Sequence, residues 1–91
     1  MEQDKRIQLL VDGEAVDFDV SLSAYNAYVN AMTPNNKVAP SHNFLMRVVR
    51  DEDRETLKAF LALPGAALDI VGALLEEYQP QLNVVVGKPS A

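Results

Sequence analysis

The sequence feature that most constrains this fold is the dipeptide Asp12-Gly13. A two-residue turn of type I′ needs positive φ at both central positions, and Asp-Gly tolerates this well. Apolar residues alternate with other residues on both sides of the dipeptide: Ile7, Leu9 and Val11 before it, and Val16, Phe18 and Val20 after it. Because alternation is the period of a half-buried strand, the pattern predicts an antiparallel hairpin over residues 6–20.

The turn also sets the register of the predicted hairpin. Counting outward pairs Val11 with Glu14, Leu9 with Val16, Ile7 with Phe18 and Arg6 with Asp19. One face of the hairpin is then apolar, and the other carries an opposite-charge pair. A lone hairpin is marginal in water, so we expect a third strand and helices that cover the apolar face.

Helical spacing of apolar residues predicts four helices after the hairpin, with cap residues and prolines at their limits. The first follows Ser21 or Ser23 and ends before Thr33-Pro34, the second begins near Pro40 and Ser41, the third is capped by Asp51, and the fourth runs from Pro64 to Pro80. The stripe of the first is Tyr25, Tyr28, Val29 and Met32. The apolar face of the fourth could serve a core or a homodimer, so the sequence is compatible with a homo-oligomer.

The run from Leu82 to Val86 predicts a last strand. Val84 and the apolar hairpin face would then form one half of a core, and the fourth helix the other half. We therefore expect an α+β fold, in which an N-terminal β-hairpin and a C-terminal strand form a small sheet packed against three to four helices. Residues 1–91 would form a single domain, with residues 1–5 and 88–91 as loose tails.

The residues that could carry chemistry are few and scattered. Cysteine is absent, and the only histidine, His42, has Ser41 beside it in sequence rather than facing it. The acids have structural reasons for their positions, on a strand face, at a helix start or near a helix end: Asp17, Asp19, Asp51, Glu52, Asp53, Glu76 and Glu77. The sequence therefore predicts no enzyme, no catalytic or metal site and no cofactor.

Charge and hydropathy argue against two classes of partner. A net charge of −5 and a pI near 4.6 disfavour nucleic acid, because phosphate affinity comes mainly from Lys and Arg. The most apolar stretch, Leu57 to Leu75, is interrupted by Lys58, Pro64 and Asp69, so it cannot span a bilayer. The charged N-terminus is not followed by the apolar region of a signal peptide. We expect a cytoplasmic protein that binds neither nucleic acid nor membrane.

The segment between the first two predicted helices is a candidate binding surface. Its eight residues, Thr33 to Pro40, are more than a helix connection requires, and they make either a plain connector or a recognition loop. With the aromatic residues and the histidine beside it, the candidate contact set is Tyr28, Asn35, Asn36, Lys37, Val38, Pro40, His42 and Phe44. Asn43, Arg47 and Arg50 form a strip that is either a solvated helix face or further contact surface.

Several runs of residues carry a family resemblance. They are Asn35-Asn36-Lys37-Val38-Ala39-Pro40, His42-Asn43-Phe44-Leu45-Met46-Arg47, Leu63-Pro64-Gly65-Ala66-Ala67-Leu68, Glu76-Glu77-Tyr78 and Val86-Gly87-Lys88. In this order, and after a start containing Leu10, Asp12-Gly13 and Phe18, they resemble a family of small phage tail assembly chaperones. The resemblance covers nearly the whole chain and carries no particular binding residue onto it.

The resemblance implies a cytoplasmic phage or prophage protein made during assembly of a long tail. Such chaperones coat the tape measure protein, a long helical and aggregation-prone chain, and help tail tube subunits gather around it. Two other interpretations stay open. A small tail or connector protein would remain in the virion, and an acidic DNA mimic would need closely spaced carboxylates over one face, whereas here the acids are interspersed with Lys and Arg.

Overall fold

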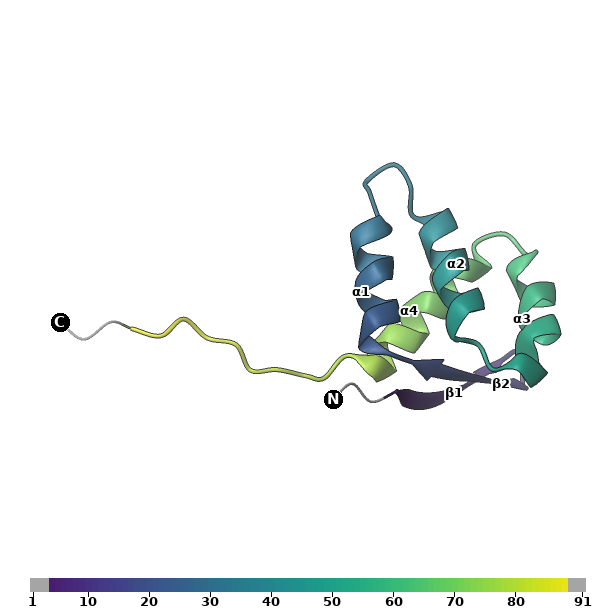
Figure 1. The fold of residues 1–91 in the computed structure, drawn as a ribbon, viewed down its shortest axis with the longest axis horizontal. Helices are drawn as coiled ribbons and strands as arrows, with labels where there is room; N and C mark the ends of the chain where they lie inside the picture. Colours follow the sequence, from purple (N-terminus) through teal and green to yellow (C-terminus); the bar gives the residue numbers. More distant parts are fainter. Residues whose placement is uncertain (1–3, 89–91) are drawn as a thin grey trace.

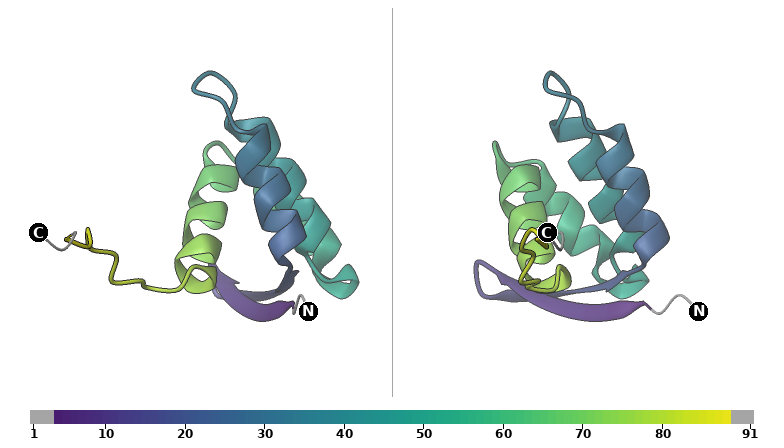
Figure 2. Two further views of the ribbon diagram at one scale, coloured as in Figure 1. Left: turned by 60° about the vertical axis from the view of Figure 1, so that its left-hand side comes forward. Right: turned by 90° about the vertical axis from the view of Figure 1, so that its left-hand side faces the viewer.

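The computed structural model describes residues 4–88 of the chain. In order, the elements are β1 (Lys5–Val11), β2 (Glu14–Val20), α1 (Leu22–Ala31), α2 (Val38–Val48), the 3₁₀ turn η1 (Asp51–Asp53), α3 (Arg54–Leu61) and α4 (Ala66–Tyr78). The hairpin β1–β2 lies along one side, and the helices stand on one of its faces (Figures 1 and 2). The fold is therefore of the predicted α+β class. Among the helices in residues 4–88, none has the length and apolar character of a membrane-spanning segment.

The hairpin has the predicted turn and the predicted register. Asp12 has φ 49° and Gly13 has φ 83°, the positive values that a type I′ turn requires. All four predicted pairs are found, from Val11 with Glu14 to Arg6 with Asp19. The side chains that face the helices are buried, and Val16, Phe18 and Val20 are completely so.

The core lies between this sheet face and the helices. It joins residues from every strand and helix: Ile7, Val16, Phe18, Val20, Ala24, Tyr28, Phe44, Leu45, Val48, Val49, Leu57, Ile70, Val71 and Leu74. α4 packs on β1, and α2 packs between α1 and α4 while also contacting β2. The apolar face of α4 therefore belongs to the core, although Leu68, at its edge, is exposed.

The helix limits differ from the predicted ones in instructive places. Ser21 caps α1, as one of the two predicted candidates, and its Oγ accepts a hydrogen bond from the Ala24 amide at 3.0 Å. The predicted α1 stripe is shifted, because Ala24 and Tyr28 are buried whereas Val29 is exposed. α4 begins at Ala66 rather than Pro64, after Gly65 with φ 77°.

The connection between α1 and α2 is shorter than predicted. α2 begins at Val38, so Pro40 lies in its first turn, where a missing amide hydrogen has no helical partner to lose. The remaining residues 32–37 fold into a tight turn, in which Thr33 and Asn36 exchange backbone hydrogen bonds of 3.2 and 3.1 Å. The predicted eight-residue loop from Thr33 to Pro40 is therefore wrong.

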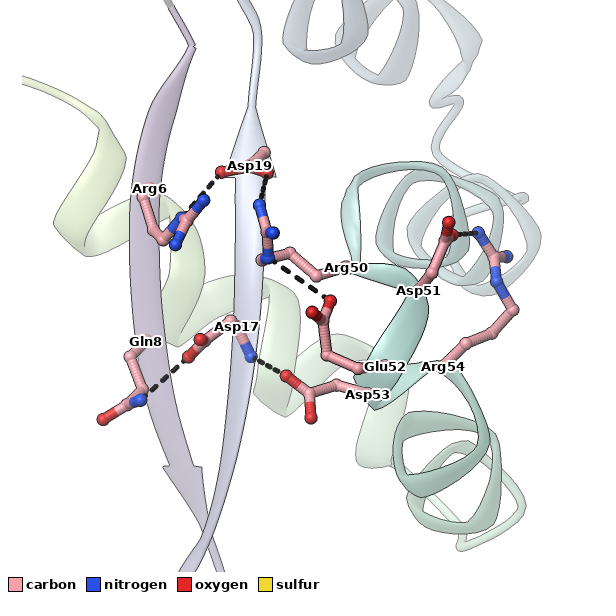
Figure 3. Close-up of polar contacts among 9 residues, drawn as sticks. All are labelled: Arg6, Gln8, Asp17, Asp19, Arg50, Asp51, Glu52, Asp53 and Arg54. Atoms are coloured by element: carbon pink, nitrogen blue, oxygen red, sulfur yellow. Dashed lines mark hydrogen bonds and ion pairs between the residues drawn. The ribbon is translucent and has the colours of Figure 1, made fainter.

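A polar junction ties the outer edge of β2 to the segment after α2 (Figure 3). Val49 bridges to Phe18, and the Arg50 amide donates to the Asp17 carbonyl at 2.9 Å. The Asp17 amide in turn donates to Asp53 Oδ2 at 2.9 Å. Asp53 is thus engaged with β2 and makes no cap bond to α3, and the predicted cap, Asp51, instead opens the turn η1.

The predicted C-terminal strand does not form. Leu82, Val84, Val85 and Val86 are between 74% and 92% exposed, and the sheet has two strands within the described residues. The physical reason is that strand propensity needs an edge to pair with. The junction residues occupy the edge of β2, and the chain after α4 runs away from the domain (Figure 1). Val84 therefore contributes nothing to the core.

The predicted tails fall mostly outside the described residues, which exclude 1–3 and 89–91. Lys5, expected in the first tail, begins β1, and its Nζ donates to the Glu77 carbonyl at 2.7 Å. The start of β1 is therefore joined to the end of α4.

Candidate functional site

The pair α1–α2 encloses a groove, called here the α1–α2 groove, with a cavity of about 250 Å³. α1, the turn after it and α2 all contribute side chains: Ala24, Ala27, Tyr28, Ala31, Asn36, Ala39, Pro40, Asn43, Phe44 and Arg47. Four of the ten are alanines. Their small side chains leave a depression between two helices that are otherwise packed against each other.

Two stacked aromatic rings make the floor of the groove. The ring centroids of Tyr28 and Phe44 lie 4.9 Å apart with an interplanar angle of 30°. Both are core residues, with only 7% and 3% of their surfaces exposed. The Tyr28 hydroxyl lies 3.5 Å from Ser41 Oγ, which donates to the Lys37 carbonyl at 2.7 Å. The floor is therefore buried, and its side chains come from both helices.

The rim of the groove is polar. Asn36 comes from the turn, and Asn43 and Arg47 lie one helical turn apart on α2. An apolar depression with amide and guanidinium groups around it is the arrangement of a protein-binding surface, where a buried centre is surrounded by hydrogen-bonding groups. The volume is smaller than the roughly 300–1,000 Å³ of small-molecule pockets, so it suits side chains projecting from a partner.

The structure brings together only half of the predicted contact set. Tyr28, Asn36, Pro40 and Phe44 line the groove. The other four, Asn35, Lys37, Val38 and His42, are exposed and do not line it. The predicted strip is also divided, because Asn43 and Arg47 line the groove whereas Arg50 is engaged in the polar junction.

Sequence reasoning missed the alanines of the groove. Ala24, Ala27 and Ala31 recur at intervals of three and four, so they lie on one face of α1. Ala39 faces them from the first turn of α2. The sequence did contain a signal for the groove, namely a helix face of small residues beside a short connection. Small side chains there let a second chain approach closely.

The carboxylates of Asp19 and Asp53 in the polar junction are bonded to other groups within the domain. Asp19 accepts from Arg50 Nη1 at 2.6 Å and from Arg6 Nε at 3.2 Å. Burial alone would raise the pKa of Asp19, but the hydrogen bonds and charges of these two arginines lower it below its usual value. Bonding to Asp19, together with nearby carboxylates, raises the pKa of Arg50. These shifts are those of ion pairs.

No catalytic or metal constellation accompanies the groove in residues 4–88. His42 is exposed on α2, and the adjacent Ser41 hydroxyl points to the Lys37 carbonyl. Across the same residues, no three His, Cys, Asp or Glu side chains stand close enough to hold a metal ion. The α1–α2 groove is thus the candidate site on this α+β domain.

Comparison with known proteins gives the family. The chain belongs to the phage tail assembly chaperone family, whose model matches residues 7–88. It is also 28% identical over 80 residues to an uncharacterized 11.3 kDa protein in the lys 3′ region of Haemophilus phage HP1 (strain HP1c1), an alignment that covers 88% of this chain and 78% of that protein. No solved structure matches. The resemblance seen in the sequence is confirmed, and an assembly chaperone is a non-enzymatic class of protein.

Proposed function

We propose that this protein binds the tape measure protein of a tailed phage in the host cytoplasm and keeps it soluble while the tail assembles. The contact surface is the α1–α2 groove. The observation that carries this proposal is the combination of an alanine-walled cavity, a buried Tyr28–Phe44 floor and a polar rim, in a chain whose family assists tail assembly. Tail tube subunits are the partners that would displace it.

The groove suits an amphipathic helix. A helix presents apolar side chains at intervals of three and four residues, and one or two of them fill a cavity of about 250 Å³. Burying each stabilises the complex by about 1.5–3 kcal/mol before the entropic cost of association is subtracted. Binding at one site is therefore modest, as a chaperone that must later be displaced requires.

The net charge of the chain supports the same role. Many copies bound along one tape measure chain would each add a charge of −5. Like charge keeps such complexes apart from each other and in solution. The negative net charge, which disfavours nucleic acid as a partner, would thus help to keep an aggregation-prone client in solution.

The test is co-expression with a tagged tape measure fragment. We expect the fragment to stay in the soluble fraction and to retain this protein during purification. Ala27→Glu places a charged side chain in the groove and should abolish both effects. The matched control is Asn26→Glu, on the adjacent exposed position of α1 that does not line the groove.

Two outcomes would overturn the proposal. If the fragment aggregates equally with and without wild-type protein, the tape measure protein is not the client. If Ala27→Glu and Asn26→Glu bind alike, the groove is not the contact surface. Mass spectrometry of mature particles separates the chaperone from a virion component, since only the latter stays in the particle.

No observation favours an acidic DNA mimic. Such a mimic needs uncompensated carboxylates over one face, whereas Asp19 lies between Arg6 and Arg50. Glu52 also pairs with Arg50, at 3.3 Å.

A further inference from the structure

The outer edge of β1 has unused backbone hydrogen-bonding groups. In an antiparallel pair, alternate residues point their amide and carbonyl groups away from the partner strand. Asp17 does so on β2, where it bonds Arg50 and Asp53, and its partner on β1 is Gln8. The outward groups of Arg6, Gln8 and Leu10 have no hydrogen-bond partner within residues 4–88.

An apolar cavity lies beside this edge. It has a volume of about 380 Å³, and apolar residues make up most of its lining: Leu9, Leu10, Val11, Phe60, Leu63, Pro64, Ala66, Ile70 and Ala73, with Asp12 and Asp69 as the two acidic residues. Leu10 is 71% exposed. A strand laid along β1 could therefore bond to the edge and place alternate side chains between β1 and α4.

The chain also has an unpartnered segment of strand-forming residues. Residues 82–86, Leu-Asn-Val-Val-Val, are rich in β-branched side chains and extended from the domain (Figure 1). No hydrogen bond joins residues 80–88 to the rest of the described chain. Four exposed apolar side chains in five residues form a patch of the kind that marks an interaction site.

We propose that residues 82–86 of one copy add as a strand to the β1 edge of a second copy, and that the exchange is reciprocal. Leu82, Val84 and Val86 share one side of an extended chain and fill the cavity, while Asn83 and Val85 stay on the outer face with Gln8. A reciprocal exchange uses both edges and both segments of a two-fold dimer, so it closes. The edge is then covered rather than left open to aggregation.

The end of α4 explains why the segment reaches another copy. The Gln79 amide donates to the Leu75 carbonyl at 2.9 Å, and Gln79 Nε2 donates to the Tyr25 hydroxyl at 2.6 Å. The Tyr25 and Tyr78 rings also meet, with centroids 5.4 Å apart. These contacts hold the exit of the chain beside α1, and Lys5 joins the same end of α4 to the start of β1. From there the chain runs away from the domain rather than back along its own β1 (Figures 1 and 2).

Cysteine cross-linking tests the exchange directly, because the protein contains no cysteine. Neighbouring strands lie about 4.8 Å apart, within the Cα separation that a disulfide spans. Gln8→Cys protein mixed with Val85→Cys protein should form a covalent heterodimer under mild oxidation. Asn26→Cys, on exposed α1, replaces Gln8→Cys as the control and should cross-link at least ten-fold less. Equal cross-linking of the two would overturn the proposal.

The double variant Gln8→Cys/Val85→Cys distinguishes the two ways in which the segment could reach β1. Reciprocal exchange predicts a covalent dimer, whereas a cross-linked monomer means that the segment folds back on its own edge and overturns the proposal.

Light scattering gives an independent measurement. The wild-type protein should have twice the monomer mass. The double variant Val84→Pro/Val85→Pro removes the donors on both sides of the segment and stiffens it, so it should be monomeric with an unchanged circular dichroism spectrum. Gln81→Pro, just before the proposed strand, should stay dimeric. A wild-type monomer, or a dimer of the double proline variant, would contradict the exchange. Neither result bears on tape measure binding, which is proposed for the α1–α2 groove.

Discussion

Residues 14–20 and residues 82–86 both contain strand-forming apolar residues, yet only the first segment is a strand within the domain. The first has a turn that returns it to β1, helices that cover its inner face, and a polar junction that bonds its outer edge. The second has none of these inside its own chain. Strand propensity alone is thus not sufficient. A segment forms a strand where neighbouring backbone groups bond to it and other side chains cover it.

The comparison predicts a large difference in stability between matched core and segment variants. Phe18 is completely buried, so Phe18→Ala should lower the free energy of unfolding by about 3–5 kcal/mol. Val84→Ala should change it by less than about 0.5 kcal/mol, because Val84 is exposed in the single chain. Urea denaturation at low protein concentration, where copies are apart, measures both. Equal effects would mean that residues 82–86 belong to the core.

A second prediction concerns the bonded edge of β2. Asp53→Ala removes the acceptor of the Asp17 amide and leaves this part-buried donor unpaired, at a cost of about 1–3 kcal/mol. Asp53→Asn keeps an oxygen at that position and should cost clearly less. Asp51→Ala is the control, since the Asp51 side chain is 98% exposed. If Asp53→Ala and Asp51→Ala unfold at the same urea concentration, the junction does not support the sheet.

A third prediction uses two glycines to test the turn. Gly13 has φ 83°, so Gly13→Ala should destabilise the hairpin by about 1–2 kcal/mol through backbone strain alone, since the added methyl meets nothing within 4 Å. Gly72→Ala, with equal space inside α4, should instead stabilise by about 0.5–1 kcal/mol. Thermal unfolding gives both signs, and a Gly13→Ala protein as stable as wild type would exclude a strained turn.

These differences also explain which parts of the structure the sequence predicted. The turn and the register of the hairpin were predicted to the residue, because the turn and the alternation are both local, although β1 begins one residue earlier, at Lys5. The bond between Asp53 and Asp17 joins residues far apart in the chain, and it redirected an acid expected at a helix start. The C-terminal strand was overpredicted because residues 82–86 carry the propensity but no information about an available edge.

The groove was half predicted for a similar reason. Tyr28 and Phe44 stand out as aromatic residues near a connection, and the structure stacks them. The alanines that shape the walls carry no distinctive chemistry, and their role depends on how closely α1 and α2 approach. The helix start at Val38 places Lys37 at the N-cap and Val38 in the first turn of α2, where neither lines the groove, and His42 is exposed on α2 outside the groove.

The smallest expected effect is the pH dependence of the ion pairs on the outer face of the hairpin. The pKa of Asp19 is lowered in the folded protein by Arg6 and Arg50. The contribution of Asp19 to folding stability is therefore fully present above the unfolded pKa near 3.8, and it is lost as pH falls through the lower folded pKa.

Asp19→Asn should therefore reduce stability at neutral pH and converge with wild type in acid. Urea denaturation from about pH 7 to below pH 4 measures this difference. Asp51→Asn, at a side chain that is 98% exposed, is the control variant. Because the Asp19 side chain is 34% exposed, added salt should shrink the Asp19 effect, and a difference that grows toward low pH would reverse the assigned direction of the shift.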